Sequence, residues 1–269
     1  MEDNRFVYIS TTQNLSRCSS KLSNIESNPY QIKLTGSSFE VLDHQEWIEC
    51  EDYWINTSPQ GSDAWKKARI GRLTMSNAGS ATNMGYDKPE EIAPIIAGIK
   101  EKKFSEFALN VMRYGTETEP EAREWYEKVK GVTVKELGLV VPKWNPFIGS
   151  SVDGELEDGI IEIKCPKIMY NPLEMHTLRL QSGWIPDKYY HGHIKDCHYC
   201  QMQGGMAILG KQWCDYVVYS PPSGKVFLDR VYFNPEFWNN TMYPRILEFL
   251  KVNLFPIYRG IPLLPNNQN

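Results

Sequence analysis

The chain has no long hydrophobic run, because its apolar stretches end well before the ~18 residues that a membrane-spanning helix requires. Its start, Met1 to Arg5, also lacks the basic and apolar parts of a secretory signal peptide. We therefore expect an intracellular protein with no membrane partner. The cytoplasm is the expected location, or the nucleus if the source is a eukaryotic virus or host.

Cysteine is scarce as well, with six residues scattered over 269 positions, which is too few for a disulfide scaffold of this size. This scarcity favours a reducing compartment and free thiols. One local cluster has spacings that could bind zinc or part of an iron–sulfur cluster: His191, His193, Cys197, His198 and Cys200. A four-cysteine site would need two further cysteines suitably placed, so packed thiols and ordinary histidines are the better interpretation.

Positive charge is not in excess. The 29 Lys and Arg residues face 33 Asp and Glu residues, which gives a formal net charge of −4. This balance argues against a protein that coats DNA, but it leaves room for an enzyme with a local basic cleft. With 41% hydrophobic residues, the chain can bury one large core or two modest ones.

One segment combines charged residues in a pattern typical of metal-dependent nucleases. Asp153 lies at a Gly-flanked turn, and the acidic stretch from Glu155 to Gly159 predicts a hairpin connection into an apolar strand. Because side chains alternate along a strand, Glu162 and Lys164 are expected on one side, with the Asp153 carboxylate beside Glu162. Two hard oxygen ligands and an ammonium group suit a magnesium-type cation and phosphodiester hydrolysis.

The same Glu-x-Lys pattern on a half-exposed strand arises by chance in many chains of this length. The residues next to the pattern favour a functional role for it. Ile160, Ile161 and Ile163 predict a strand within a largely buried sheet, where two ionisable groups need partners. Buried charges that pair in this way are commonly functional.

The order of the expected elements predicts an α/β fold with a mixed sheet flanked by helices. Residues 1–56 form a separate N-terminal segment with short β-like pieces at 6–9 and 39–42. After it, Asp63 is a plausible cap for the first helix, and Pro120 opens a helix with acidic residues near its start. Helices are expected at 64–69, from 74 or 76, and at 90–98, 104–112, 120–130, 195–209 and 236–255; strands are expected at 132–141, 147–152, 160–163, 213–219 and 226–233.

Five blocks in a fixed order together resemble the phage lambda exonuclease or YqaJ-type viral recombinase family, within the PD-(D/E)XK nuclease superfamily. The blocks are residues 65–76, 115–122, 151–154, 162–166 and 201–203. The resemblance implies a restriction-endonuclease-like α/β core, with a nuclease domain over residues 57–269. It does not cover residues 1–56, which are expected to be an N-terminal extension of unknown role.

The resemblance also implies roles for single residues. Asp153 and Glu162 match metal ligands, Glu119 in the first turn of its helix matches an additional acid, and the Ile163 carbonyl is a further oxygen. Lys164 matches the catalytic lysine, and Gln201 matches a glutamine that orients the lysine or the attacking water. Arg69, Ser76 and Ser151 match residues that hold a terminal 5′-phosphate. His198 departs from the family pattern, where a tyrosine is usual.

Taken singly, several of these residues have simpler interpretations. Glu119 would be a helix-start carboxylate, Ser76 a helix cap, Arg69 a surface arginine and Gln201 an exposed helical residue. Only the joint match to the family favours the functional interpretation. Within that match, the metal is expected to be Mg²⁺, with Mn²⁺ as a substitute.

The resemblance implies a 5′-to-3′ exodeoxyribonuclease that acts on the ends of double-stranded DNA and leaves 3′ single strands for recombination. A single-strand annealing protein and a homo-oligomeric ring are the implied partners. Two alternatives remain open from the residues alone. One is a restriction-like or nicking endonuclease on the same metal-dependent core, and the other is a DNA-binding protein without catalysis.

Overall fold

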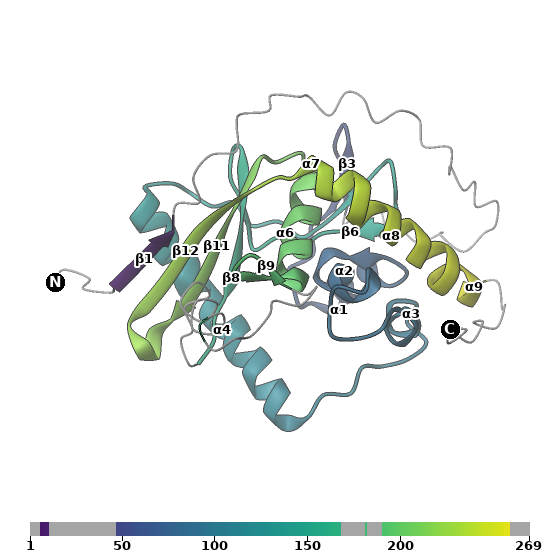
Figure 1. The fold of residues 1–269 in the computed structure, drawn as a ribbon, viewed down its shortest axis with the longest axis horizontal. Helices are drawn as coiled ribbons and strands as arrows, with labels where there is room; N and C mark the ends of the chain where they lie inside the picture. Colours follow the sequence, from purple (N-terminus) through teal and green to yellow (C-terminus); the bar gives the residue numbers. More distant parts are fainter. Residues whose placement is uncertain (1–5, 11–46, 168–180, 182–189, 259–269) are drawn as a thin grey trace.

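The computed structural model describes residues 6–10, 47–167, 181 and 190–258. A five-stranded mixed sheet forms its centre, in the order β1-β12-β11-β8-β7 (Figure 1). β8 and β11 run parallel, as do β1 and β12, whereas β11 with β12 and β7 with β8 are antiparallel. The strands are β1 (Phe6–Ser10), β7 (Gly154–Glu155), β8 (Gly159–Lys164), β11 (Trp213–Ser220) and β12 (Lys225–Tyr232).

Helices cover both faces of this sheet, which explains why its central strands are apolar on both sides. On one face, Ile160 and Tyr216 belong to the large core that also contains Met202 and Met206 of α6 (Asp196–Leu209). On the other face, Ile161 packs in a second cluster with residues of α4 (Glu106–Lys130). The predicted mixed sheet between helices is confirmed.

Three helices precede α4, and the second of them packs against α6. They are α1 (Asp63–Arg69), α2 (Met75–Ala81) and α3 (Pro89–Ile96). Ser62, not Asp63, caps α1, because its hydroxyl accepts a hydrogen bond from the Trp65 N–H at 3.2 Å. α2 and α6 approach closely at Gly204, where a Cβ atom would stand 2.1 Å from the Met75 sulfur.

The two helices predicted at 104–112 and 120–130 are one continuous helix, α4, so this part of the prediction was wrong. Ser105 caps it, and Pro120 lies inside it. A proline inside a helix removes one backbone hydrogen bond, but α4 continues through it and packs Ala122, Trp125 and Tyr126 against the sheet. Glu119 therefore lies in the middle of a helix and not in a first turn.

A second sheet, in the order β2-β3-β5, stands beside the main one. It contains β2 (Trp47–Glu49), β3 (Tyr53–Asn56) and β5 (Leu139–Pro142), and a short parallel pair joins β4 (Leu73–Thr74) to β6 (Ile148–Gly149). Strand pairs therefore connect residues on both sides of position 56. The division of the chain at that position stays a prediction, and the predicted strand at 39–42 lies outside the described residues.

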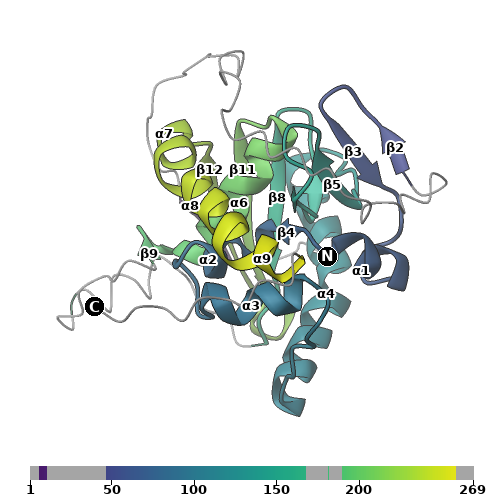
Figure 2. The ribbon, with the colours of Figure 1, turned by 90° about the vertical axis from the view of Figure 1, so that its right-hand side faces the viewer.

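The chain closes with a helical run over the surface of α2 and α3 (Figure 2). It comprises α7 (Pro235–Phe237), α8 (Tyr243–Phe249) and α9 (Phe255–Tyr258), joined by π-helical turns at Trp238–Met242 and Leu250–Leu254. A small hairpin of β9 (Tyr190–His191) and β10 (Ile194–Lys195) leads into α6. None of the described helices is both long and apolar enough to cross a membrane.

Candidate active site

The β7–β8 hairpin fixes Asp153 against β8. Gly154 and Glu155 pair with Ile161 and Ile160, which places Asp153 at the start of the hairpin. One oxygen of its carboxylate, Oδ2, accepts a hydrogen bond from the peptide N–H of Ile163 at 2.6 Å. A carboxylate bonded in this way has little freedom to turn away from β8.

Glu162 and Lys164 lie on the same side of β8, as the alternation of side chains predicts. The Lys164 ammonium donates a hydrogen bond to Glu162 Oε1. The Glu162 side chain is 3% exposed and that of Lys164 is 29% exposed, so the pair lies at the boundary between core and solvent. This arrangement leaves the lysine within reach of a molecule bound at the surface.

Glu119 reaches the same region from α4. Burial and, to a lesser degree, the nearby Asp153 raise the pKa of its carboxyl group to about 7, against the opposing effect of Arg123. Burial and Asp153 likewise raise the pKa of Glu162 to about 8, against the opposing effect of Lys164. Burial also raises the pKa of Asp153. Three acids in a poorly hydrated region thus repel one another, which a bound cation would relieve.

The donor set fits a hard divalent cation, because carboxylate oxygens are the ligands that Mg²⁺ prefers. As the side chains lie, Lys164 contacts Glu162 and Arg123 contacts Glu119. Within the described ranges, no three Asp, Glu, His or Cys side chains are arranged around a common metal position. Asp153, Glu162 and Glu119 match a metal site by the type and charge of their side chains. Their roles as ligands stay predictions, as does that of the Ile163 carbonyl.

Gln201 lies on the face of α6 that faces β8. One turn later on this face, a Cβ atom at Gly205 would stand 3.0 Å from Ile160. One turn earlier, His198 lies close enough to Lys164 for the ammonium to lower the imidazole pKa. Gln201 therefore lies on the part of α6 that packs beside β8, and its role at the site stays a prediction.

The three residues predicted to hold a phosphate are linked through two others. Arg69 Nη2 donates to Ser76 Oγ at 3.1 Å and to Thr74 Oγ1 at 2.9 Å. Its guanidinium carbon lies 4.1 Å from the centre of the Trp65 ring. The Trp65 indole in turn donates to Ser151 Oγ at 3.0 Å. A guanidinium and hydroxyl groups from α1, α2 and the segment before Asp153 thus form one polar pocket.

Arg69 carries its charge in this pocket without a carboxylate. Burial lowers the pKa of its guanidinium to about 10. Among the ion pairs between described residues, none involves Arg69. A partly buried cation that donates only to neutral hydroxyl groups is well suited to a phosphate, which would supply the missing charge.

The chain matches the sequence profile of one protein family. The sequence profile of the YqaJ-like viral recombinase domain matches residues 64–212, which is more than half of the chain. The chain belongs to this family. No curated protein sequence matches it.

Solved structures confirm the fold. A crystal structure of an alkaline exonuclease, LHK-Exo from Laribacter hongkongensis, is 26% identical and superposes with a TM-score of 0.54, covering 74% of this chain and 97% of that one. A crystal structure of LHK-Exo in complex with dAMP is 27% identical, with a TM-score of 0.53 and coverage of 71% and 91%. The likeness confirms the predicted restriction-endonuclease-like α/β core of the YqaJ-like domain.

The histidines and cysteines near the start of α6 have partners inside the protein. His193 Nε2 lies 2.7 Å from Asp229 Oδ2, and His198 Nδ1 lies 2.9 Å from the Tyr216 hydroxyl. Burial, together with Lys164 and Lys195, lowers the pKa of His198 to about 3, so its ring is neutral. The side chain of His191 lies outside the described residues. The five described cysteines are free thiols.

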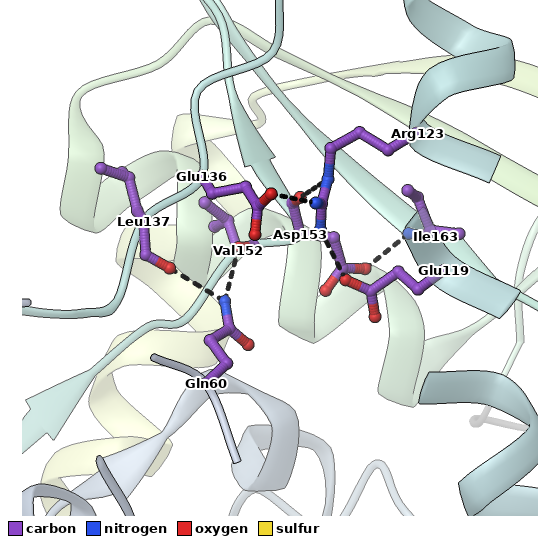
Figure 3. Close-up of polar contacts among 8 residues, drawn as sticks. All are labelled: Gln60, Glu119, Arg123, Glu136, Leu137, Val152, Asp153 and Ile163. Atoms are coloured by element: carbon purple, nitrogen blue, oxygen red, sulfur yellow. Dashed lines mark hydrogen bonds and ion pairs between the residues drawn. The ribbon is translucent and has the colours of Figure 1, made fainter. Parts of the chain in front are cut away.

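Two residues that hold the site were missed from the sequence (Figure 3). Gln60 Nε2 donates to the carbonyl of Val152 at 3.1 Å and to that of Leu137 at 2.9 Å. Arg123 contacts both Glu119 and the backbone of Asp153. Arg123 is four residues after Glu119, the spacing that places two side chains on one helix face, so this signal was present in the sequence.

Proposed function

We propose that this protein is a magnesium-dependent exodeoxyribonuclease that degrades one strand of double-stranded DNA from a 5′ end. Membership of the YqaJ-like viral recombinase family and the 26–27% identity with an alkaline exonuclease support a nuclease that hydrolyses DNA. The proposed polarity, from the 5′ end, rests on one observation, the short separation between the Arg69 pocket and the acids. Ser151 belongs to the pocket and Asp153 to the acids, so their Cα atoms are at most about 7 Å apart.

This separation suits the end of a strand. A terminal 5′-phosphate bound by Arg69, Ser76 and Ser151 would bring the next phosphodiester of the same strand towards Asp153. An internal phosphate carries chain on both sides and only one negative charge, so it would use the pocket less well. Release of one mononucleotide from the 5′ end, with a growing 3′ single strand, is the expected result.

Asp153 and Glu162, with Glu119, would hold the cation, and Mn²⁺ would substitute for Mg²⁺. When bound, the metal supplies neutralisation of phosphate charge and a lowered pKa for water. Water attacks the phosphorus, the bond from phosphorus to the 3′ oxygen breaks, and a proton passes to that oxygen. Lys164 lies where its ammonium can stabilise the added negative charge, and the Gln201 amide can orient the lysine or the water.

The proposal extends to the biological setting. The family's description as a viral recombinase supports a role in recombination by strand annealing, with a single-strand annealing protein as partner. A homo-oligomeric ring that encloses the DNA is proposed by analogy with the lambda-type enzymes. An intracellular site of action follows from a DNA substrate.

The test uses linear duplex DNA labelled at its 5′ ends, with or without a 5′-phosphate, and a covalently closed circle. Wild type and Lys164→Ala are compared in Mg²⁺ and in Mn²⁺. We expect phosphate-stimulated release of mononucleotides from linear DNA alone, and its loss in the variant. Cleavage of the circle would replace the exonuclease by an endonuclease, and inactivity of the wild type on every substrate would indicate a DNA-binding protein without catalysis.

A further inference from the structure

Arg123 joins two parts of the acidic site with one guanidinium group (Figure 3). Its Nη2 donates to Glu119 Oε1 at 2.9 Å, and its Nε donates to the backbone carbonyl of Asp153 at 3.1 Å. The third nitrogen, Nη1, lies 2.6 Å from Glu136 Oε1. All three nitrogens of the group thus have an acceptor, and the side chain is only 12% exposed.

The three contacts require the shape of arginine. A guanidinium is planar and directs its N–H groups in fixed, diverging directions, whereas a lysine offers a single nitrogen at the end of a flexible chain. Lysine could neutralise Glu119, but it could not bond the Asp153 carbonyl and Glu136 at the same time. Charge alone therefore does not account for the arrangement.

Stability of α4 does not account for it either. An ion pair between Glu119 and Arg123 on one helix stabilises that helix only slightly, and it needs no contact outside the helix. The bond to the Asp153 carbonyl reaches a turn that is 30 residues further along the chain. It connects α4 to the β7–β8 hairpin at the residue whose carboxylate faces Ile163.

The bond to Glu119 also selects which oxygen stays available. Arg123 engages Oε1 of Glu119, and Figure 3 shows the Glu119 carboxyl group beside that of Asp153. Held in this way, the Glu119 carboxyl group stays beside that of Asp153. Without Arg123, the side chain would sample other rotamers and lose this direction.

We propose that Arg123 is a positioning residue that sets Glu119 and the Asp153 backbone in the arrangement required to bind the catalytic cation. The inference rests on the proposed function. It assigns Arg123 no contact with DNA and no role in proton transfer. Partners of metal ligands that act in this way commonly change metal affinity or activity by roughly 10- to 100-fold when they are replaced.

The experiment compares wild type with Arg123→Lys, which keeps the charge and loses the fork. Mn²⁺ binding is measured by isothermal titration calorimetry without DNA, and kcat and KM are measured on 5′-phosphorylated duplex in Mg²⁺. We expect a roughly 10- to 100-fold loss of Mn²⁺ affinity and of kcat at low Mg²⁺, with KM for DNA nearly unchanged. Arg113→Lys, on an exposed position of the same helix, is the matched control and should behave as wild type.

Rescue and folding give further readouts. Added guanidinium ion should restore part of the activity of Arg123→Ala but should not affect Arg113→Ala. If Arg123→Lys does not fold, as shown by circular dichroism, Glu136→Ala is the second variant, because Glu136 is 74% exposed. It frees one arm of the guanidinium and should reduce Mn²⁺ affinity by a smaller factor.

A folded Arg123→Lys variant with wild-type Mn²⁺ affinity and kcat would overturn the inference. Where Glu136→Ala is needed instead, an unchanged Mn²⁺ affinity in that variant would overturn it. The proposed function fails separately, if the wild type has no metal-dependent nuclease activity or if it cuts the closed circle. An active wild type with an unaffected Arg123→Lys variant therefore rejects the positioning role alone.

Discussion

The indole Nε1 of Trp65 donates a hydrogen bond to the hydroxyl of Ser151 at 3.0 Å. The same indole ring stacks beneath the guanidinium of Arg69, and Ser151 lies two residues before Asp153. Trp65 therefore ties α1 to the segment that carries an acid of the site. The phosphate pocket and the acids are held as one unit, so we expect changes in the first to reach the second.

Replacing Trp65 by phenylalanine tests this connection. Trp65→Phe keeps an aromatic ring under Arg69 but removes the N–H group that donates to Ser151. We expect a loss of about 0.5–1.5 kcal/mol in unfolding free energy and a clear loss of the preference for 5′-phosphorylated ends. The measurement is the ratio of initial rates on duplexes with and without the phosphate. Trp144→Phe, at a half-exposed position, is the control, and an unchanged ratio in Trp65→Phe would reject the connection.

Arg69 gives a prediction in which stability and function change in opposite directions. Burial lowers the pKa of Arg69, which shows that its charge is poorly compensated in the free protein. Arg69→Met keeps much of the apolar stem, so we expect equal or higher thermal stability together with lost phosphate preference. Inorganic phosphate should raise the Tm of wild type but not that of the variant. A phosphate-dependent Tm rise of wild-type size in Arg69→Met would contradict this account.

The raised pKa values of Glu119 and Glu162 predict how stability depends on pH without metal. Their ordinary value is 4.5, and in the folded protein they rise to about 7 and about 8. At pH values between the ordinary pKa and the raised pKa, the folded protein holds protons that the unfolded chain has released. The free energy of unfolding therefore falls as pH rises from about 4.5 to about 8, and it changes no further through these groups above that range.

Bound Mg²⁺ should reverse this loss, because it favours the deprotonated carboxylates. We expect the Mg²⁺-dependent increase in Tm to be larger at about pH 9 than at about pH 6. Differential scanning fluorimetry with and without Mg²⁺ at both pH values measures it. Glu162→Gln should reduce the difference between the two, and equal increases at both pH values in the wild type would refute the assignment of these acids to the metal.

Features with a short sequence period were predictable, because they depend on neighbouring residues. The alternation along β8 gave the shared side of Glu162 and Lys164, and the polar stretch after Gly154 gave the hairpin. The fold class followed from the order of helices and strands. The pocket residues Arg69, Ser76 and Ser151 came from the family resemblance, and the structure brings them together through Trp65 and Thr74.

Features that depend on distant contacts were not predictable. Pro120 indicates a helix start, and only the packing of the following turns against the sheet makes α4 continuous through it. The bond from Arg123 to the Asp153 carbonyl spans 30 residues, so the sequence showed only the four-residue spacing between Glu119 and Arg123. Gln60 gave no local signal at all, since its acceptors Leu137 and Val152 lie 77 and 92 residues further along the chain.

Asp215 provides a test of the fold that is separate from the site. Its side chain is 0% exposed, and it accepts hydrogen bonds from the Tyr126 hydroxyl at 2.7 Å and from Arg230 at 2.6 and 2.9 Å. These bonds join α4 to β11 and β12. Asp215→Ala would leave the tyrosine hydroxyl and the guanidinium without this acceptor, and removing one partner of a buried pair costs about 3–5 kcal/mol.

We expect the loss for Asp215→Ala to lie near the lower end of this range, because Arg230 is 37% exposed and water can solvate part of its charge. Urea unfolding followed by circular dichroism measures it, and the exposed Asp158→Ala variant should change stability by less than about 0.5 kcal/mol. Below its unfolding transition, Asp215→Ala should keep the wild-type preference for 5′-phosphorylated ends, because the hydrogen bonds of Asp215 go to Tyr126 and Arg230, which are not residues of the pocket. A loss below about 1 kcal/mol would show that the buried carboxylate contributes little net stability, since its desolvation would then cancel its hydrogen bonds.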